Sequence, residues 1–258
     1  MFSYISKIIP YERLSCNPYI CDLSLGQILS LMKNLLAIIL LVTITISIQA
    51  QESQTRSVSP FTGVKSAEGI DVYLTKGEKE SVRVEVTGTK LENIITEVSG
   101  SYLKVHMRDG NYRGHVDAKV FVTYVKIDKL SASSAGSIFS EGTIDANTLE
   151  ISSSSAGNVE VTINAGSVEV SASSAGEAEL KGKTKSLLAE ASSAGEIDAY
   201  DLEAQKVDVE ASSAGSIKVN ATEELDAHAS SGGSIRYRGN PNKSITDSSS
   251  GGSVKKSN

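Results

Sequence analysis

The chain has no tryptophan, four prolines and only 5% aromatic residues in 258. A thick sandwich core requires large side chains, so this composition favours a thin, aliphatic core. After residue 50, no useful length of sequence has the 3.6-residue periodicity of an amphipathic helix. A helical bundle and a helical solenoid are therefore excluded.

Cysteine is nearly absent too, because Cys16 and Cys21 are the only two. They precede a segment with the three parts of a secretory signal peptide: a basic start at 32–34, an apolar run at 35–48 and a small-residue end at 48–50. The run of about 14 residues is short for a membrane span. We therefore predict that residues 1–31 are an upstream mis-start and that residues 32–50 are a signal peptide. The protein would be exported to the periplasm, the outer surface or the medium.

The predicted mature chain, from about residue 51, has no cysteine. It therefore has no disulfide, no lipid-anchoring thiol and no cysteine nucleophile. Without the first 50 residues, it keeps 22 of the 25 basic and 29 of the 31 acidic residues, a net charge of −7. This acidic balance argues against nucleic acid and anionic membranes as partners.

What the chain does contain is a repeat. Ser-Ser-Ala-Gly or Ser-Ser-Gly-Gly occurs seven times, and successive copies lie 18 to 21 residues apart. The final glycines, which we predict to be structural corners, are Gly136, Gly157, Gly176, Gly195, Gly215, Gly233 and Gly252. A fixed short period indicates a solenoid whose units are stabilised by stacking on their neighbours.

Hydrophobic alternation on both sides of each motif excludes a flexible Ser/Gly linker. In the five inner repeats, the positions eight and six before and two and four after the glycine are hydrophobic in 20 cases of 20. The interleaved positions hold one hydrophobic residue in 20, Leu188. This period of two is typical of half-buried strands.

Each repeat therefore reads as strand, tight turn, strand and variable turn. The fold class is all-β, a single-stranded parallel β-helix with coils of 18 to 21 residues. We expect the corner glycine to adopt a positive φ, so that Gly195→Val would cost about 1 to 3 kcal/mol. We also expect the serine side chains to bond the turn backbone and to form ladders between coils.

The rest of the mature chain is assigned from the same patterns. Residues 58–127 alternate without the motif and hold most of the mature aromatics, which indicates a bulkier start, either irregular first coils or a cap. One domain then spans 58–254, with the motif-bearing coils at 128–254. Residues 51–57 are assigned as a short linker and 255–258 as a tail.

Three sequence blocks resemble a known family. They are Pro60-Phe61-Thr62-Gly63-Val64, Gly69-Ile70-Asp71-Val72, and Ile235-Arg236-Tyr237-Arg238-Gly239-Asn240-Pro241, which closes the motif-bearing coils. Together they resemble the head GIN domain of putative auto-transporter adhesins, a family of exported Bacteroidota proteins. The resemblance implies a right-handed parallel β-helix and a role in adhesion. We expect no C-terminal translocator barrel after residue 258, unlike an auto-transporter.

Charged residues recur three positions after the corner glycine. They change from acidic to basic along the chain: Glu160, Glu179, Asp198, Lys218, Arg236 and Lys255. Stacked carboxylates about 5 Å apart repel, so such a column either stays solvated or takes a cation such as calcium. We expect a solvated face and no metal, with Glu160, Glu179 and Asp198 as the candidates if one binds.

No other pattern points to catalysis or to a cofactor. His106, His115 and His228 occur singly without metal-ligand spacing. Seven equivalent serines without a nearby His/Asp partner indicate structure rather than a nucleophile.

Three classes of function remain. The preferred one is an exported, non-enzymatic adhesin or envelope-binding scaffold. Its polar faces and its stack of variable loops, including 141–148 and 200–206, would contact a glycan or protein partner at the cell surface. Self-association into a homo-oligomer stays open. The second is a polysaccharide-active or calcium-binding β-helix that uses the column of Glu160, Glu179 and Asp198. An enzyme would have Glu179, Asp198 and Lys218 as its centre. The third, an ice binder, would need Thr-x-Thr ladders that are absent here.

The signal-peptide assignment predicts where the mature protein starts. N-terminal sequencing of protein isolated from native cells should begin near Gln51. Finding residues 1–31 on the isolated protein would contradict the assignment.

Overall fold

The computed structural model describes residues 30, 32–33, 52–112 and 114–257. Apart from these three residues near position 30, the predicted mis-start and signal peptide lie outside the described part of the chain. Ala50–Asn258 form one compact unit. Among the described residues, no helix is long and apolar enough to cross a membrane.

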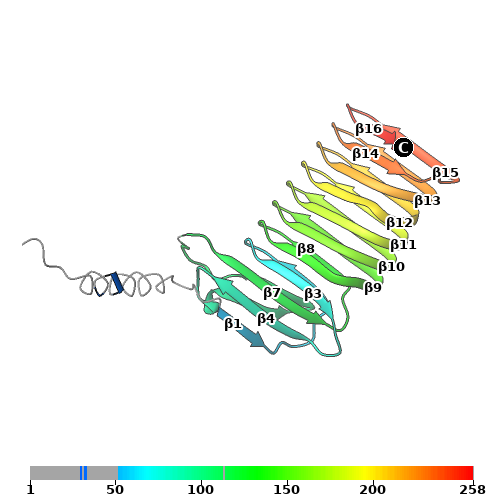
Figure 1. The fold of residues 1–258 in the computed structure, drawn as a ribbon. Coiled ribbons are helices and arrows are strands. Elements are labelled where there is room, and N and C mark those ends of the chain that lie inside the picture. The colour runs from blue at the N-terminus through cyan, green and yellow to red at the C-terminus, as the bar shows by residue number, and fades with distance from the viewer. Residues whose placement is uncertain (1–29, 31, 34–51, 113, 258) are drawn as a thin grey trace, which may run out of the picture. The chain divides into compact units, whose positions relative to one another are not determined.

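The motif-bearing region is a β-solenoid of stacked, parallel coils (Figure 1). Five long strands of 14 to 18 residues each run from one corner to the next. The strands are β8 (Lys129–Ala132), β9 (Ser137–Ser154), β10 (Asn158–Ser173), β11 (Glu177–Ala191), β12 (Glu196–Ala211), β13 (Ser216–Ala229), β14 (Ser234–Arg238), β15 (Lys243–Ser248) and β16 (Ser253–Lys256). The predicted all-β parallel solenoid is confirmed.

Alternation places aliphatic columns inside the coils. The second position after each corner is in register along the stack and is buried, as Ile138, Val159, Ala178, Ile197 and Ile217 show. Burial of such aliphatic side chains contributes most of the stabilisation of a fold of this kind. The core is narrow and almost entirely aliphatic, which agrees with the scarcity of aromatic residues.

Residues 58–127 supply both early coils and a cap. β2 (Gly63–Ser66) and β3 (Asp71–Lys76) form one coil, and β6 (Tyr102–Met107) and β7 (Asp117–Tyr124) form another. β2 pairs in parallel with β6 and β8, and β3 pairs in parallel with β7 and β9. The coil formed first along the chain therefore lies between the β6–β7 coil and the first motif-bearing coil.

Antiparallel strands close this end of the stack. β4 (Ser81–Thr87) pairs with β7, β5 (Ile94–Ser99) pairs with β6, and β1 (Glu52–Arg56) pairs with β4; the 3-10 turn η1 (Leu91–Asn93) precedes β5. Covering an open sheet edge prevents it from pairing with other chains.

Two segments differ from their predicted assignments. The expected linker at 51–57 contains β1, and the Arg56 guanidinium donates to the carbonyls of Ile94 (2.6 Å) and Leu91 (2.8 Å) and to Thr96 Oγ1 (3.0 Å). The expected tail begins inside β16, which pairs with β14. Both segments complete a sheet, so backbone pairing overrides their polar composition.

The corner has a different geometry from the one predicted. The second serine of each motif has φ of 47° to 51°, and the third residue has φ of 58° to 80°, whereas none of the seven final glycines has a positive φ. The final glycine N–H donates to the carbonyl of the first serine at 2.7 to 2.9 Å. This is a type I′ turn, and the expectation of a positive φ at the glycine was wrong.

The glycine is required because backbones approach closely there. A Cβ added at any of the seven glycines would lie 2.2 to 2.8 Å from backbone atoms of the preceding coil. In the corner between β2 and β3, the equivalent position is Ile70. Its carbonyl accepts a hydrogen bond from the Ser137 N–H, just as the Gly136 carbonyl accepts one from the Asn158 N–H in the next corner. Ile70 borders a cavity rather than a backbone, so it can carry a large side chain.

Backbone groups, rather than serine side chains, carry the ladder across the corners. At the five corners from Ala135 to Ala214, the N–H of the third residue donates to the carbonyl of the second serine in the next coil, at 3.1 to 3.2 Å. Inside the corner, the position four before the glycine is always small: Ala132, Ser153, Ala172, Ala191, Ala211, Ala229 and Ser248. One of these, Ser153, donates its hydroxyl to the Gly157 carbonyl at 2.7 Å.

The positive φ of the third motif residue and the close backbone contact of the final glycine predict opposite effects of substitution at these two adjacent positions. Ala194 has φ of 62°, a region that costs an L-residue about 1 to 2 kcal/mol. Ala194→Gly should therefore raise the free energy of unfolding by about 0.5 kcal/mol, after the greater unfolded-state entropy of glycine is subtracted. Gly232 and Gly251 already occupy this position in their own corners. Urea denaturation measures the change.

Gly195→Ala should instead destabilise by about 3 kcal/mol, since the new Cβ would lie 2.3 Å from the Ala172 carbonyl oxygen. Glu169→Ala, at an exposed strand position, is the control and should change stability by less than about 0.5 kcal/mol. Similar urea midpoints for Ala194→Gly and Gly195→Ala would contradict the assignment of the two roles.

Candidate binding surfaces

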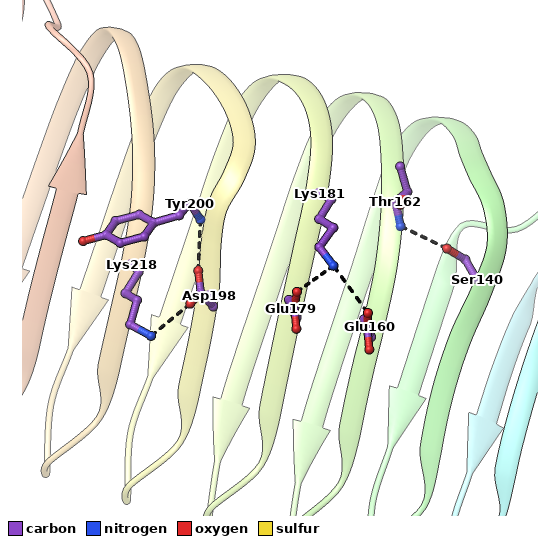
Figure 2. Close-up of polar contacts among 8 residues, drawn as sticks. All are labelled: Ser140, Glu160, Thr162, Glu179, Lys181, Asp198, Tyr200 and Lys218. Carbon is purple, nitrogen blue, oxygen red and sulfur yellow. Dashed lines mark hydrogen bonds and ion pairs between the residues drawn. The ribbon is translucent and has the colours of Figure 1, made fainter.

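The charged column predicted from the sequence lies on one outer face of the solenoid. Register pairs Glu160 with Glu179, Glu179 with Asp198, and Asp198 with Lys218. The column continues through Arg236 to Lys255. Figure 2 shows its acidic half and Lys218 on successive coils. We call this surface the charged face; it includes the residues one, three and five positions after each corner glycine.

Aromatic rings extend the same column toward the cap. Phe139 stacks on Tyr73 with ring centroids 5.2 Å apart, and Tyr73 stacks on Phe121 at 5.3 Å. The guanidinium of Arg83 lies 4.0 Å from the centroid of Phe121. Because these rings cover each other's faces, they stabilise coil stacking rather than offering a flat platform to a ligand.

A lysine that the sequence analysis missed joins two of the stacked acids. Lys181 Nζ lies 2.7 Å from Glu179 and 3.4 Å from Glu160 (Figure 2). Hydrogen bonding to Glu179 is the main cause that raises the pKa of Lys181. Lys181 is five positions after Gly176, so the alternation of the strand could have placed it on this face.

A second lysine joins the next acids. Lys218 Nζ lies 2.9 Å from both Asp198 and Glu196. Its pKa is raised mainly by the hydrogen bond to Asp198, then by that to Glu196, against the effect of desolvation. Asp198 also accepts from the Tyr200 N–H at 3.2 Å. The acidic half of the column is thus a set of ion pairs.

This pairing bears on the metal and catalytic hypotheses. Among residues 52–112 and 114–257, no group of three or more His, Cys, Asp or Glu side chains is arranged to hold a metal ion. Asp198 and Lys218 do come together, while Glu179 pairs with Lys181 instead. A lysine with a raised pKa remains protonated near neutral pH, so Lys218 is poorly suited to act as a general base.

The predicted stack of variable loops carries a groove of about 480 Å³. It crosses three coils, and its lining includes Asp145, Asn147, Asn164, Lys126 and Lys185. Asp145 is fixed by Lys76 Nζ at 3.0 Å and by Asn164 Nδ2 at 3.1 Å. The bond from Asn164, and then Lys76, lowers the pKa of Asp145, so this carboxylate stays ionised as a hydrogen-bond acceptor. We call this surface the loop-stack groove.

A cavity of about 420 Å³ lies where the loop between β6 and β7 replaces a tight corner. Ile70, Met107 and Val116 supply apolar surface, and Glu68 and Arg108 supply charge. Glu68 accepts from the Met107 N–H at 2.7 Å, so this carboxylate holds the loop. No feature of the sequence had pointed to this cavity.

Comparison with known proteins places the chain in a family. The family described as "Putative auto-transporter adhesin, head GIN domain" matches residues 60–241, and the chain belongs to it. The predicted resemblance is therefore confirmed. No match was found among curated proteins.

Solved structures share the fold at low sequence identity. A putative adhesin from Bacteroides fragilis is 21% identical with a TM-score of 0.72, covering 81% of this chain and 97% of its own. A putative lipid binding protein from Parabacteroides distasonis is 22% identical with a TM-score of 0.66, covering 82% and 98%. A putative adhesin from Parabacteroides merdae is 16% identical with a TM-score of 0.65, also covering 82% and 98%.

The ion pairs on the charged face predict how its acids respond to substitution. Lys181→Gln should lower the urea midpoint at low salt, because Glu160 and Glu179 would then face each other without a cation. Adding Glu179→Gln should recover most of the loss. Glu179→Gln alone should change little, since exposed ion pairs contribute little.

Calcium provides the matching control for this prediction. Millimolar calcium should leave the melting temperature of the wild type unchanged. An upward shift with calcium that Glu179→Gln abolishes would show a metal site on this column instead.

Proposed function

We propose that the protein is an exported, non-enzymatic adhesin or envelope-binding scaffold that contacts a glycan or a protein through the loop-stack groove. Membership of an adhesin family supports this class of function. The observation that carries the proposal is the groove itself, a solvent-open surface on successive coils that presents polar side chains from each of them.

The chemistry of the groove suits a polyhydroxylated ligand. Asn147 and Asn164 offer amide donors and acceptors, and Asp145 offers an ionised acceptor held in place by two partners. Lys126 and Lys185 add donors at the rim. Such groups recognise hydroxyls of a sugar or polar groups of a protein backbone.

A polysaccharide-active enzyme is the second candidate, and the geometry supports it less. Its proposed centre, Glu179, Asp198 and Lys218, lies on an exposed sheet face where two lysines already neutralise the acids. The spaces beside these residues are about 160 and 190 Å³, smaller than the loop-stack groove.

A glycan array probed with the wild type and with groove variants tests the proposal. Asn147→Ala, at an exposed position in the groove, should weaken binding to any glycan hit by about 5- to 10-fold, as expected for the loss of one hydrogen bond. Glu169→Ala, exposed but outside the groove, should bind as the wild type does. An equal affinity of the wild type and Asn147→Ala would remove the groove from the proposal.

A further inference from the structure

The charged face has a pattern that complements itself. Along the column, three acids, Glu160, Glu179 and Asp198, are followed by three bases, Lys218, Arg236 and Lys255, one per coil and in continuous register. A twofold axis that lies in the plane of the face, parallel to the strands and between Asp198 and Lys218, reverses this order. Each acid of one copy then faces a base of the other.

We propose that two copies of this chain associate through their charged faces about this axis. Asp198 would face the second copy's Lys218, Glu179 its Arg236 and Glu160 its Lys255. The same surface is used twice, as in most symmetric dimers. The parallel coils keep a regular spacing of about 4.8 Å, so all the pairs can meet at once.

The cationic half of the face has unused pairing capacity. Lys218 binds Asp198 and Glu196, but neither Arg236 nor Lys255 has an acidic partner within the described part of the chain. These two cations are adjacent in register and exposed, so they repel each other in the isolated molecule. An acidic surface opposite them would remove this repulsion.

The flanking positions on the charged face follow the same axis. It places each position opposite the same position of the second copy, on the opposite coil. Glu177 then faces the second copy's Ser234, and Glu196 faces its Ser216. Lys181 faces the second copy's Arg238, a like-charge pair, but Lys181 is already paired with two acids of its own copy. Over the three columns, the acidic half carries five acids and one base and the basic half carries four bases, so the two halves remain complementary.

The expected interaction is electrostatic and sensitive to salt. Sedimentation equilibrium of the purified protein should show a dimer at about 20 mM salt that dissociates near 0.5 M, where screening is strong. Arg236→Glu and Glu179→Arg should each weaken self-association by about 10- to 100-fold, because each places like charges opposite each other twice. Lys65→Glu is the control, an exposed charge reversal outside the charged face on β2.

Mixing the two variants gives the sharpest result. The Arg236→Glu copy and the Glu179→Arg copy are each self-repelling, but together they restore opposite charges at both sites. We expect a heterodimer close to wild-type affinity. Urea midpoints of the two variants establish that both are folded. A monomeric wild type at low salt, a mixture without heterodimer, or dimers unaffected by either reversal would overturn the proposal. None of these outcomes bears on ligand binding at the loop-stack groove.

Discussion

The close approach of one coil's backbone to the next is the constraint on which this structure depends. Parallel strands lie about 4.8 Å apart, and at the corner the chain must turn without leaving that spacing. The turn is type I′, so two consecutive residues adopt positive φ and the residue after them lies against the preceding coil. In the seven motif corners only glycine fits there, and the position inside the bend holds only alanine or serine. These requirements explain why the motif Ser-Ser-Ala-Gly or Ser-Ser-Gly-Gly recurs at each of these corners.

The two ends of the stack meet the same physical problem differently. At the N-terminal end, β4 and β5 pair antiparallel with β7 and β6, and Arg56 holds β1 and η1 against β5. At the C-terminal end, β15 carries Ser244 and Thr246 at positions that are aliphatic in the inner coils, and its residues are exposed. Polar and charged residues on a terminal strand disfavour pairing with other chains.

Much of the fold could be predicted because strand alternation and the repeat period are local properties of the sequence. The order of the early coils could not, since the placement of β2 and β3 between the β6–β7 coil and the first motif-bearing coil depends on tertiary pairing. The corner shows that a sequence pattern can be correct while its physical explanation is not. A recurring glycine can be required by a positive φ or by a close contact, and the sequence pattern alone does not distinguish the two. Ser193 and Ala194 carry the strain instead.

The candidate surfaces also differ in how far the local sequence predicts them. The column from Glu160 to Lys255 followed directly from the repeat, because each coil presents one residue per position. Lys181 was missed because the prediction considered only the position three after each corner glycine. The position five after the glycine lies on the same face of the strand. The presence of this lysine changes the expectation for metal binding. A column of unpaired carboxylates favours binding of a cation, whereas carboxylates already paired with lysines do not. The loop-stack groove could be placed only in outline, because its polar lining comes from three separate bends. A solenoid of this kind fills its interior with aliphatic side chains, so the surfaces it can offer to a partner are outer ones that repeat from coil to coil.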